Sequence, residues 1–526
     1  MGTNDLHGHI EATPLLGGYL KNLRHAREKD GAVLLVDAGD MFQGTLESNL
    51  GEGIAVLHAY KALRYDAAAI GNHEFDYGPV GAAATPEKAG DNPRGALAAL
   101  AANASFPMLS ANILLKETRN RFEIGRPSVL VTAGGIKIGL IGVSTAETLK
   151  TTASGNVKDL EMAPLAETIE REATRLRKEE GADLVVAMAH AGGVCKGYSG
   201  DFLKDDCEAD GEIFHVAEKL PKGLVDAIVA GHTHKSVAEV VNGIPIIESF
   251  SYGKAFGRID FTVDLTTGSP AKIVDAHLYP PHGLCSDVNA SVETCDAGTY
   301  EGSPVERDAD VTAAIAPDVE KAKGRREEPL GVVLEERVRR DHEHESEEGN
   351  LFTDLLKKAH PEVTIALMNG GGLRADLPSG PLNYGALYEA FPFDNKTGIA
   401  EISGADLLRI LSAHFHEKGG VLSVSGIRVR ATCDKGAVKV DVTYDNGKKV
   451  GDKDKIVILA SDFMMTGGDS FWGPLTPPKY TIKDEIMRDT LEAELRKMKT
   501  IKPSSLLDPA HPRMSFPGVR PVRCKE

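Results

Sequence analysis

The sequence predicts an α/β protein built from two domains of unequal size. A chain of 526 residues is too long for one hydrophobic core, so a division into two domains is expected. From Met1 to about Leu278, short β-rich apolar runs alternate with helical stretches. Because these runs are apolar almost throughout, the sheet that they form should be covered on both faces. The first domain is therefore predicted to be an α/β sandwich.

The elements of the first domain are predicted in chain order. The apolar runs expected to form strands are residues 32–40, 66–74, 137–145, 183–190 and 226–234. Residues 165–181 have the apolar spacing of a helix. Residues 79–105 are rich in Ala and interrupted by Pro and Gly, so we expect a surface excursion there. The first domain is predicted to span residues 1–304.

The second half of the chain begins after a charged segment. Residues 305–328 combine charge with helical spacing and are predicted to form a connecting helix. A second α/β region, residues 329–526, follows and contains a helical stretch at 483–499 near its end. We therefore expect a smaller C-terminal domain joined to the first by a helix.

Composition limits the class of protein. The formal charge of −17 argues against nucleic acid or an anionic membrane as the main partner. A phosphate-bearing substrate would then need strong local positive charge, such as bound metal. No apolar run approaches the ~18–20 residues of a membrane span. The first residues have no basic segment followed by an apolar stretch, so no signal peptide is expected in the sequence as given.

The cysteines bear on the cellular compartment. They are Cys195, Cys207, Cys285, Cys295, Cys433 and Cys524. The first four form two closely spaced pairs inside polar stretches, a pattern typical of loop-closing disulfides, which need an oxidising compartment. The alternative is six free thiols in a cytosolic enzyme, and spacing alone does not fix the connectivity.

Five short polar motifs stand where predicted strands end. They are NDLHGH (4–9), DAGD (37–40), GNHE (71–74), AMAH (187–190) and GHTH (231–234). Any one alone has an ordinary explanation, because an Asp after a strand is more often a turn residue. Open α/β sheets place their ligand sites at the carboxyl ends of strands, however, and five such motifs in succession exceed ordinary packing demands.

The residue types in these motifs predict a metal centre. The candidate ligands are Asp5, His7, Asp40, Asn72, His190, His232 and His234. Mixed Asp, Asn and His ligands suit borderline divalent ions such as Zn, Mn, Fe or Co. Seven ligands are too many for one tetrahedral ion but fit two ions ~3.5–4 Å apart with one shared carboxylate. Such a pair clamps a phosphoryl group and turns a bridging water into a hydroxide for in-line attack.

The order of the motifs resembles that of the calcineurin-like metallophosphoesterases. The longer strings GNHEFDYG (71–78) and FPMLSANI (106–113) are similar to the 5′-nucleotidase branch, which includes UDP-sugar hydrolases. The resemblance implies a four-layer α/β/β/α sandwich followed by a 5′-nucleotidase-type C-terminal domain. It also implies two ligand sets: Asp5, His7, Asp40 and His234 for the first ion; Asp40, Asn72, His190 and His232 for the second.

The same resemblance implies catalytic roles for two further residues. His73 would face the substrate and stabilise charge on the phosphoryl oxygens or the leaving group. Asp76 would orient His73. Relatives that act on 2′,3′-cyclic and 3′-nucleotides tend to carry Asn at the position of Asp76, so this residue favours 5′-substrates.

The C-terminal region resembles the domain that reads the nucleoside in this family. Without the resemblance, Phe393 and Phe463 would be interpreted as core residues. With it, these two rings are expected to sandwich the base, a contact worth ~1–3 kcal/mol per base. Asp469 would accept hydrogen bonds from the ribose hydroxyls, and Asn369 with Arg374 would hold the ribose, base or phosphate edge.

One position departs from the family pattern. Family members commonly carry Arg just before an E-x-x-x-G-N segment, and His342 stands there in this chain. Either Arg339 or Arg340 takes that place, or one substrate contact is weaker and depends on pH. The departure bears on leaving-group preference rather than on hydrolysis.

We therefore expect a metal-dependent phosphohydrolase that releases phosphate from nucleoside 5′-monophosphates, with di- and triphosphates or UDP-sugars as further substrates. The alternatives are a 2′,3′-cyclic-nucleotide phosphodiesterase with 3′-nucleotidase activity, a catalytically silent secreted nucleotide-binding protein, and a related hydrolase of oxidised sulfur compounds. The partner would be a small nucleotide, and the protein would be a monomer or homodimer.

The N-terminus raises a question about the first strand. Only four residues precede Asp5, too few for a supporting strand of ordinary length. We expect a signal peptide and the beginning of that strand to precede Met1, which agrees with a periplasmic or secreted location.

Overall fold

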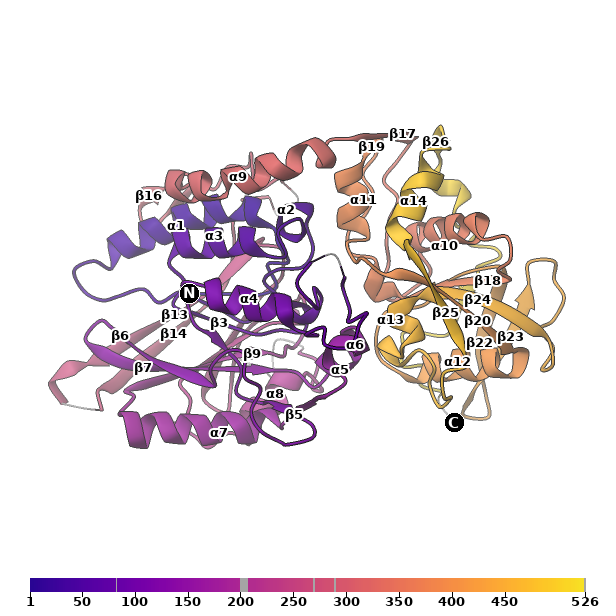
Figure 1. Cartoon of the computed structure of the whole chain (residues 1–526). Helices are drawn as coiled ribbons and strands as arrows, with labels where there is room; N and C mark the ends of the chain where they lie inside the picture. Colours follow the sequence, from indigo (N-terminus) through magenta and orange to yellow (C-terminus); the bar gives the residue numbers. More distant parts are fainter. Residues whose placement is uncertain (82, 199–206, 268–269, 288–289, 525–526) are drawn as a thin grey trace. The chain divides into compact units, whose positions relative to one another are not determined.

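The computed structural model describes residues 1–81, 83–198, 207–267, 270–287 and 290–524. The chain forms two compact units (Figure 1). Unit 1 comprises Met1–Gln43 and Glu47–Lys321, and unit 2 comprises Gly44–Leu46 and Ala322–Glu526.

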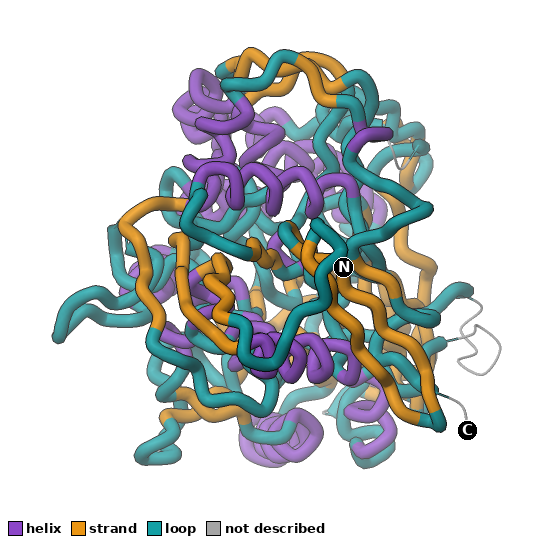
Figure 2. Tube along the Cα trace, turned by 90° about the vertical axis from the view of Figure 1, so that its right-hand side faces the viewer, coloured by secondary structure: helices purple, strands orange, loops and turns teal. Residues whose placement is uncertain are grey.

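The first sheet of unit 1 brings the N-terminus into its centre. Its six strands are, in spatial order, β14 (Lys272–Gly283), β13 (Ala255–Asp264), β1 (Gly2–Thr3), β2 (Val36–Asp37), β3 (Ala67–Ala69) and β4 (Met108–Leu109). Strands β1 to β4 are parallel neighbours, whereas β13 pairs antiparallel with β1. Figure 2 shows the N-terminus beside strands, which are drawn in orange. Strand β1 is only two residues long, yet it is hydrogen-bonded on both sides, so the chain that leads to Asp5 is fixed.

The second sheet of unit 1 has the same mixed character. Its spatial order is β11 (Ser236–Val241), β12 (Ile244–Ser249), β10 (Ala227–Ala230), β9 (Leu184–His190), β7 (Ile136–Ser144) and β6 (Ser128–Ala133). Strands β12, β10, β9 and β7 are parallel. One buried cluster joins the two sheets: it takes Val36 and Ala69 from the first and Leu140, Val186 and Val229 from the second.

Helices cover the outer face of each sheet. Over the first sheet lie α1 (Thr13–Ala26), α3 (Ile54–Leu63) and α4 (Gly95–Asn103), which share a buried apolar cluster. Over the second lie α7 (Leu165–Arg175), which continues through a π-helical turn, and α8 (Glu212–Lys219). Unit 1 is thus a four-layer α/β/β/α sandwich, and the predicted fold class is confirmed.

Shorter elements complete unit 1. They are the helices α2 (Leu46–Asn49), α5 (Thr148–Thr151) and α6 (Ser154–Val157), the strand pair β5 (Ile113–Leu115) and β8 (Leu160–Met162), and the strand pair β15 (Thr299–Tyr300) and β16 (Ser303–Pro304). Helix α2 begins at the last residue of the short segment that belongs to unit 2. Helix α9 (Ala309–Arg326) leads from unit 1 into unit 2.

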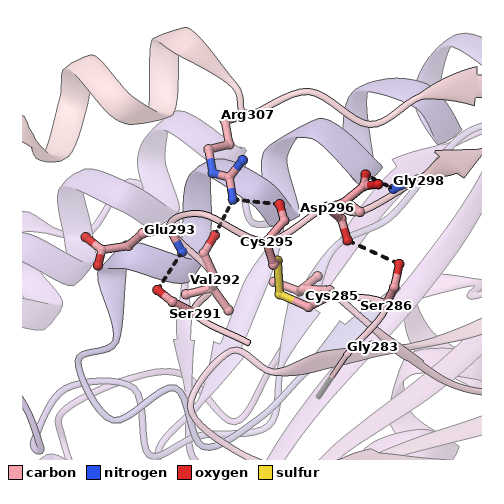
Figure 3. The surroundings of a disulfide bond; sticks show 12 residues. Gly283, Cys285, Ser286, Ser291, Val292, Glu293, Cys295, Asp296, Gly298 and Arg307 are labelled. Carbon is pink, nitrogen blue, oxygen red and sulfur yellow. Dashed lines mark hydrogen bonds between the residues drawn. A yellow bond between two sulfur atoms is a disulfide. The ribbon is translucent and has the colours of Figure 1, made fainter. Parts of the chain in front are cut away.

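Three disulfides close loops in the described structure. Cys195–Cys207 and Cys285–Cys295 are the two closely spaced pairs, as predicted, and Cys433–Cys524 joins positions 91 residues apart. Figure 3 shows Arg307 donating to the carbonyls of Val292 and Cys295, at 2.7 and 3.2 Å, beside the second disulfide. This loop is therefore tied to the segment that precedes α9.

Unit 2 is an α/β unit with one central sheet. The five strands are, in spatial order, β21 (Ser423–Ser425), β18 (Ile365–Met368), β24 (Lys455–Ser461), β20 (Lys396–Ser403) and β25 (Tyr480–Ile486). Helices α10 (Glu347–Ala359), α11 (Tyr384–Ala390) and α14 (Met487–Leu495) share one core with this sheet. Helix α12 (Gly404–His416) belongs to a second core, which also contains α13 (Asp462–Met465).

Two small three-stranded sheets complete unit 2. One is β19 (Gly380–Asn383), β17 (Pro329–Leu334) and β26 (Thr500–Ile501). The other is β23 (Ala437–Tyr444), β22 (Ile427–Asp434) and β27 (Met514–Ser515).

Two local expectations were wrong. The predicted helix at 483–499 begins only at Met487, because residues up to Ile486 pair with β20 as strand β25. The segment 79–105 is not merely a surface excursion, since α4 buries Leu97 and Leu100 in the core outside the first sheet. In both cases the local sequence pattern was ambiguous, and tertiary packing determined the structure of the segment.

Candidate active site

The polar motifs meet at the carboxyl ends of parallel strands from both sheets of unit 1. Asp5 and His7 follow β1, Asp40 follows β2 and Asn72 follows β3. From the second sheet, His190 ends β9, and His232 and His234 follow β10. The structure therefore gathers all seven candidate ligands, although they span most of the length of unit 1.

The backbone turns sharply at these residues. Asp5, His7, Asp40, His232 and His234 all have positive φ, between 49° and 81°. This left-handed region is uncommon for residues other than Gly, but Asp, Asn and His enter it several-fold more often than other types. These turns carry the side chains whose ligand atoms lie close together.

The donor atoms form two groups that share Asp40. Asp5, His7, Asp40 and His234 have ligand atoms within 4.8 Å of one another, and so do Asp40, His190 and His232. The side-chain oxygen of Asn72 lies 3.0 Å from a ring nitrogen of both His190 and His232. Asn72 therefore belongs to the second group.

Hydrogen bonds outside the groups set which nitrogen of two histidines points inward. His7 Nδ1 faces the Gln43 carbonyl at 2.7 Å, and His190 Nδ1 faces the Ala38 carbonyl at 3.0 Å. A carbonyl only accepts, so both Nδ1 atoms carry hydrogen and both Nε2 atoms point into the site. His7 Nε2 lies 3.0 Å from His234 Nε2.

His190 and Asp40 shift each other's pKa in opposite directions. Burial acts to lower the pKa of His190, but the carboxylate of Asp40, 3.0 Å from Nε2, raises this pKa to about 10. Conversely, burial acts to raise the pKa of Asp40, but His190 and His73 hold it well below its usual value. The two shifts favour a protonated His190 beside an ionised Asp40, so the negative charge of Asp40 is balanced by a neighbouring positive charge.

The geometry fits divalent metal ions. Nitrogen and oxygen ligands about 2.0–2.2 Å from one ion stand about 3.0–3.5 Å apart. The His7–His234 separation of 3.0 Å, the His190–Asp40 separation of 3.0 Å and the His234–Asp5 separation of 3.4 Å fall in that range. The His7–Asp40 and His7–Asp5 separations, 3.8 and 4.0 Å, are longer, so small shifts of these side chains would complete the first group around an ion.

Glu74 holds two of the turns together and takes no place in either group. Its buried carboxyl accepts hydrogen bonds from the backbone N–H groups of Asp40, Met41 and Gly71, at 2.9, 2.6 and 2.5 Å. Burial raises the pKa of Glu74 to about 8. A side chain at Gly71 would place its Cβ 2.3 Å from Asp40 Oδ1, so glycine is needed where these turns meet.

Glu248 binds backbone N–H groups at the turn between His232 and His234. The sequence motifs did not identify this residue. It lies on β12, is fully buried, and accepts from Gly193 N–H at 3.1 Å and Thr233 N–H at 3.2 Å. Thr233 stands between His232 and His234 in the GHTH motif. The signal in the sequence was a single acid inside the apolar run IPIIESF (244–250).

His73 lies beside the two groups. Its backbone N–H donates to Asp40 Oδ1 at 2.8 Å, and its ring is 5.1 Å from that of His7. Its Nδ1 lies 2.5 Å from Asp76 Oδ2, so the carboxylate of Asp76 accepts the Nδ1 proton. With Nδ1 bound to Asp76, Nε2 is the ring nitrogen that could face a substrate.

Among the five candidate nucleoside contacts of unit 2, Asn369 contacts Asp469, and Arg374 lies near Phe393. Asn369 Nδ2 donates to Asp469 Oδ2 at 2.7 Å, and the Arg374 guanidinium lies 5.9 Å from the centre of the Phe393 ring. Phe463 packs against Gly468, where an added Cβ would lie 2.4 Å from the ring.

His342 lies next to the glycine turn after β18. A Cβ at Gly420 would stand 2.9 Å from both His342 Nε2 and Gly371 N. The His342 carbonyl accepts from Val421 N–H at 2.9 Å. The histidine that replaces the expected arginine therefore stands within reach of the Asn369–Gly372 turn.

Comparison with known families agrees with both units. Residues 1–236 match the calcineurin-like phosphoesterase family, and residues 324–474 match the 5′-nucleotidase C-terminal domain. The chain belongs to the 5′-nucleotidase branch of the calcineurin-like phosphoesterases. Members of the calcineurin-like family use divalent metal ions, in keeping with the two donor groups.

Individual relatives of this phosphoesterase are distant. A cell wall protein of Listeria monocytogenes is 26% identical over 517 residues, which cover 90% of this chain but only 63% of that protein. A 5′-nucleotidase of Vibrio cholerae is 26% identical over 496 residues, covering 88% and 83% of the two chains. The crystal structure of a 5′-nucleotidase precursor from Thermus thermophilus superimposes with a TM-score of 0.74 at 23% identity, covering 95% and 96%. The last comparison shows the shared fold.

None of the described helices combines the length and apolar character needed to cross a membrane.

Proposed function

We propose that this phosphoesterase releases phosphate from nucleoside 5′-monophosphates with the help of two divalent metal ions. The observation that carries the proposal is the position of His73 beside two donor groups that share Asp40. Its Nδ1 atom is hydrogen-bonded to Asp76 Oδ2 at 2.5 Å. A pure binding protein would need neither the shared carboxylate nor the oriented imidazole.

The two metal sites are proposed from the donor groups. Asp5, His7, Asp40 and His234 would hold one ion; Asp40, Asn72, His190 and His232 would hold the other. The mixture of nitrogen and oxygen donors favours Zn, Mn, Fe or Co. When bound, such a pair activates water as a nucleophile and polarises the phosphoryl oxygens.

The residues of the chain supply the remaining steps. Asp76 accepts the Nδ1 proton of His73 and so fixes the orientation of the ring. A protonated His73 presents its Nε2–H to the phosphoryl group or the leaving oxygen, where it stabilises the negative charge that develops. Glu74 and Glu248 hold the turns by their backbone amides and keep the donor atoms in place.

We propose that unit 2 selects the nucleoside. The side chain of Asp469, paired with Asn369 at 2.7 Å, would bind the ribose hydroxyls, and Phe393 and Phe463 would stack on the base. The charge on Arg374, 5.9 Å from the Phe393 ring, would attract the phosphate edge. Stacking tolerates different bases, so several nucleotides should be accepted.

We propose a periplasmic or secreted location on the evidence of the disulfides. Three disulfides in one chain favour an oxidising compartment over the cytosol.

The decisive experiment is phosphate release from 5′-AMP, with 3′-AMP, 2′,3′-cyclic AMP and UDP-glucose in parallel. Each is assayed with Zn, Mn or Co, with chelator, and with the His73→Ala variant. We expect chelator-sensitive release from 5′-AMP that collapses in the variant. Preference for 3′-AMP or the cyclic nucleotide would refute the 5′-nucleotidase proposal, and tight adenosine binding without phosphate release would indicate a silent binding protein.

A further inference from the structure

We propose that Glu147 is a positioning residue that fixes which nitrogen of His232 faces the metal. This inference rests on the proposed two-metal centre. It concerns a residue outside the five motifs, in the loop between β7 and α5.

The two nitrogens of His232 have different partners. Nδ1 points into the second donor group, 3.0 Å from Asn72 Oδ1. Nε2 points outward and lies 3.0 Å from Glu147 Oε2. A carboxylate accepts only, so the Nε2 atom carries hydrogen and the Nδ1 lone pair is left for a metal ion.

The outer partner of His232 differs from those of His7 and His190. These two histidines direct their outer nitrogens at backbone carbonyls, which are neutral and fixed by the fold. Glu147 instead offers a charged side chain, and a charge-assisted hydrogen bond is roughly twice as strong as a neutral one. The second donor group should therefore bind metal more tightly because Glu147 fixes the ring orientation and the tautomer of His232.

The position of Glu147 is determined by its backbone. Its N–H donates to Thr145 Oγ1 at 3.2 Å, and its carbonyl accepts from the N–H groups of Lys150 and Thr151 at 2.7 and 2.9 Å. The nearby carboxyl of Glu212 is held by the Thr145 hydroxyl at 2.7 Å. Glu147 is thus presented to His232 from an anchored turn.

His232 needs such a partner more than His7 and His190 do. Its side chain is 16% exposed, whereas those of His7 and His190 are 1% and 0% exposed. Packing alone holds a ring in place less firmly at the edge of the site. The Glu147 side chain is itself 59% exposed, so it acts at the solvent-facing rim.

The test measures metal affinity rather than activity. Zn²⁺ binding to the full chain is measured by competition with a chelator of known affinity, for wild type, Glu147→Gln and the matched control Glu167→Gln. Gln keeps the size of the side chain but removes its charge, and Glu167 is an exposed glutamate on α7. We expect Glu147→Gln to raise the Kd of one of two sites by about 10–100-fold, with the control unchanged.

Two background variants assign the affected site. His7→Ala removes a donor of the first group, and His190→Ala removes a donor of the second. We expect Glu147→Gln to weaken the zinc site that remains in the His7→Ala protein and to leave the one in the His190→Ala protein unchanged. Equal weakening in both backgrounds, or none in either, would overturn the inference.

The outcome is separable from the proposed function. Wild-type protein that binds two zinc ions but releases no phosphate from 5′-AMP would refute the proposed substrate and not the role of Glu147. A selective loss at the second site in that protein would still support the inference.

Discussion

Replacement of Glu248 by Gln should change how the stability of unit 1 depends on pH. The Thr233 hydroxyl lies 2.6 Å from Glu248 Oε1 and 2.9 Å from the Gly193 carbonyl. A hydroxyl has one proton, so if it donates to the carbonyl, Glu248 must be protonated and donate to Thr233. Burial, with a further contribution from the charge of Asp5, raises the pKa of Glu248 to about 8 despite the hydrogen bonds from Thr233 and Gly193. Glu248 should therefore be neutral at pH 7.

The sign of the effect follows from the direction of the shift. The folded protein keeps a proton that the unfolded chain loses between pH 4.5 and 8, so the free energy of unfolding falls as pH rises through this range. For a pKa of about 8 against 4.5, the wild type loses about 3–4 kcal/mol between pH 5 and pH 8. Glu248→Gln has no proton to lose and should lack this decrease.

The variant also has a cost that does not depend on pH. The Gln amide can accept from Gly193 N–H and donate to the Thr233 hydroxyl, but Thr233 N–H then loses its acceptor. An unsatisfied buried donor costs about 1–3 kcal/mol. We therefore expect the variant to be less stable than wild type near pH 5 and at least as stable near pH 8.

The assay is urea unfolding of the metal-free protein in chelator at pH 5, 6, 7 and 8. The sole tryptophan, Trp472, lies in unit 2, so its fluorescence identifies the unfolding of that unit. The remaining transition in far-ultraviolet circular dichroism reports unit 1. Asp37 and Glu74, whose pKa values burial also raises, are present in both proteins and cancel in the difference.

One result would refute this reasoning about Glu248. If the difference in unfolding free energy between wild type and Glu248→Gln stays constant from pH 5 to pH 8, Glu248 does not titrate in that range in the folded protein. Glu167→Gln serves as the control, because an exposed glutamate should not alter the pH dependence.

Three further predictions test the proposed site and unit 2. His73→Ala should lower kcat for 5′-AMP by about 10²–10³-fold with unchanged metal content by mass spectrometry; a parallel loss of metal would contradict a catalytic role. Phe463→Ala should weaken AMP binding by ~1–3 kcal/mol, or about 5–150-fold. The change is measured as KM and by Trp472 fluorescence, and an unchanged KM would exclude stacking on Phe463. Replacing Cys433 and Cys524 together by Ser removes a link across 91 residues and should lower the unfolding free energy of unit 2 by about 4–5 kcal/mol, and an unmoved Trp472 transition would contradict this.

Much of the fold and the location of the donor residues could be predicted from local pattern. Asp40, Asn72 and His190 each follow an apolar run, and parallel strands align their carboxyl ends at one edge of a sheet. The strand boundaries were less predictable. The run at 32–40 contributes only Val36–Asp37 as strand, because the adjacent β1 is itself two residues long.

Contacts between distant elements could not be predicted. Glu147 and Glu248 act on His232 and Thr233 across 85 and 15 residues, and nothing near either glutamate in the sequence specifies the partner. The disulfide between Cys433 and Cys524 could not be predicted either, because loop-closing pairs are recognisable in a sequence only when the spacing is short. These partners depend on how the sheets are assembled.

The left-handed turns explain why two acids outside the donor groups, Glu74 and Glu248, are buried beside the site. Asp5, Asp40 and the histidines of the GHTH motif adopt positive φ, a conformation that stays populated only when the surroundings impose it. Glu74 and Glu248 impose it by accepting backbone N–H groups from the turn at Asp40 and from the turn at Thr233. A carboxyl whose pKa is raised to about 8 is costly to bury, and that cost is offset only by what it holds in place. Substitution of either acid should therefore disturb the geometry of the donor atoms before it unfolds the sandwich, since the strands themselves are held by separate hydrogen bonds and apolar cores.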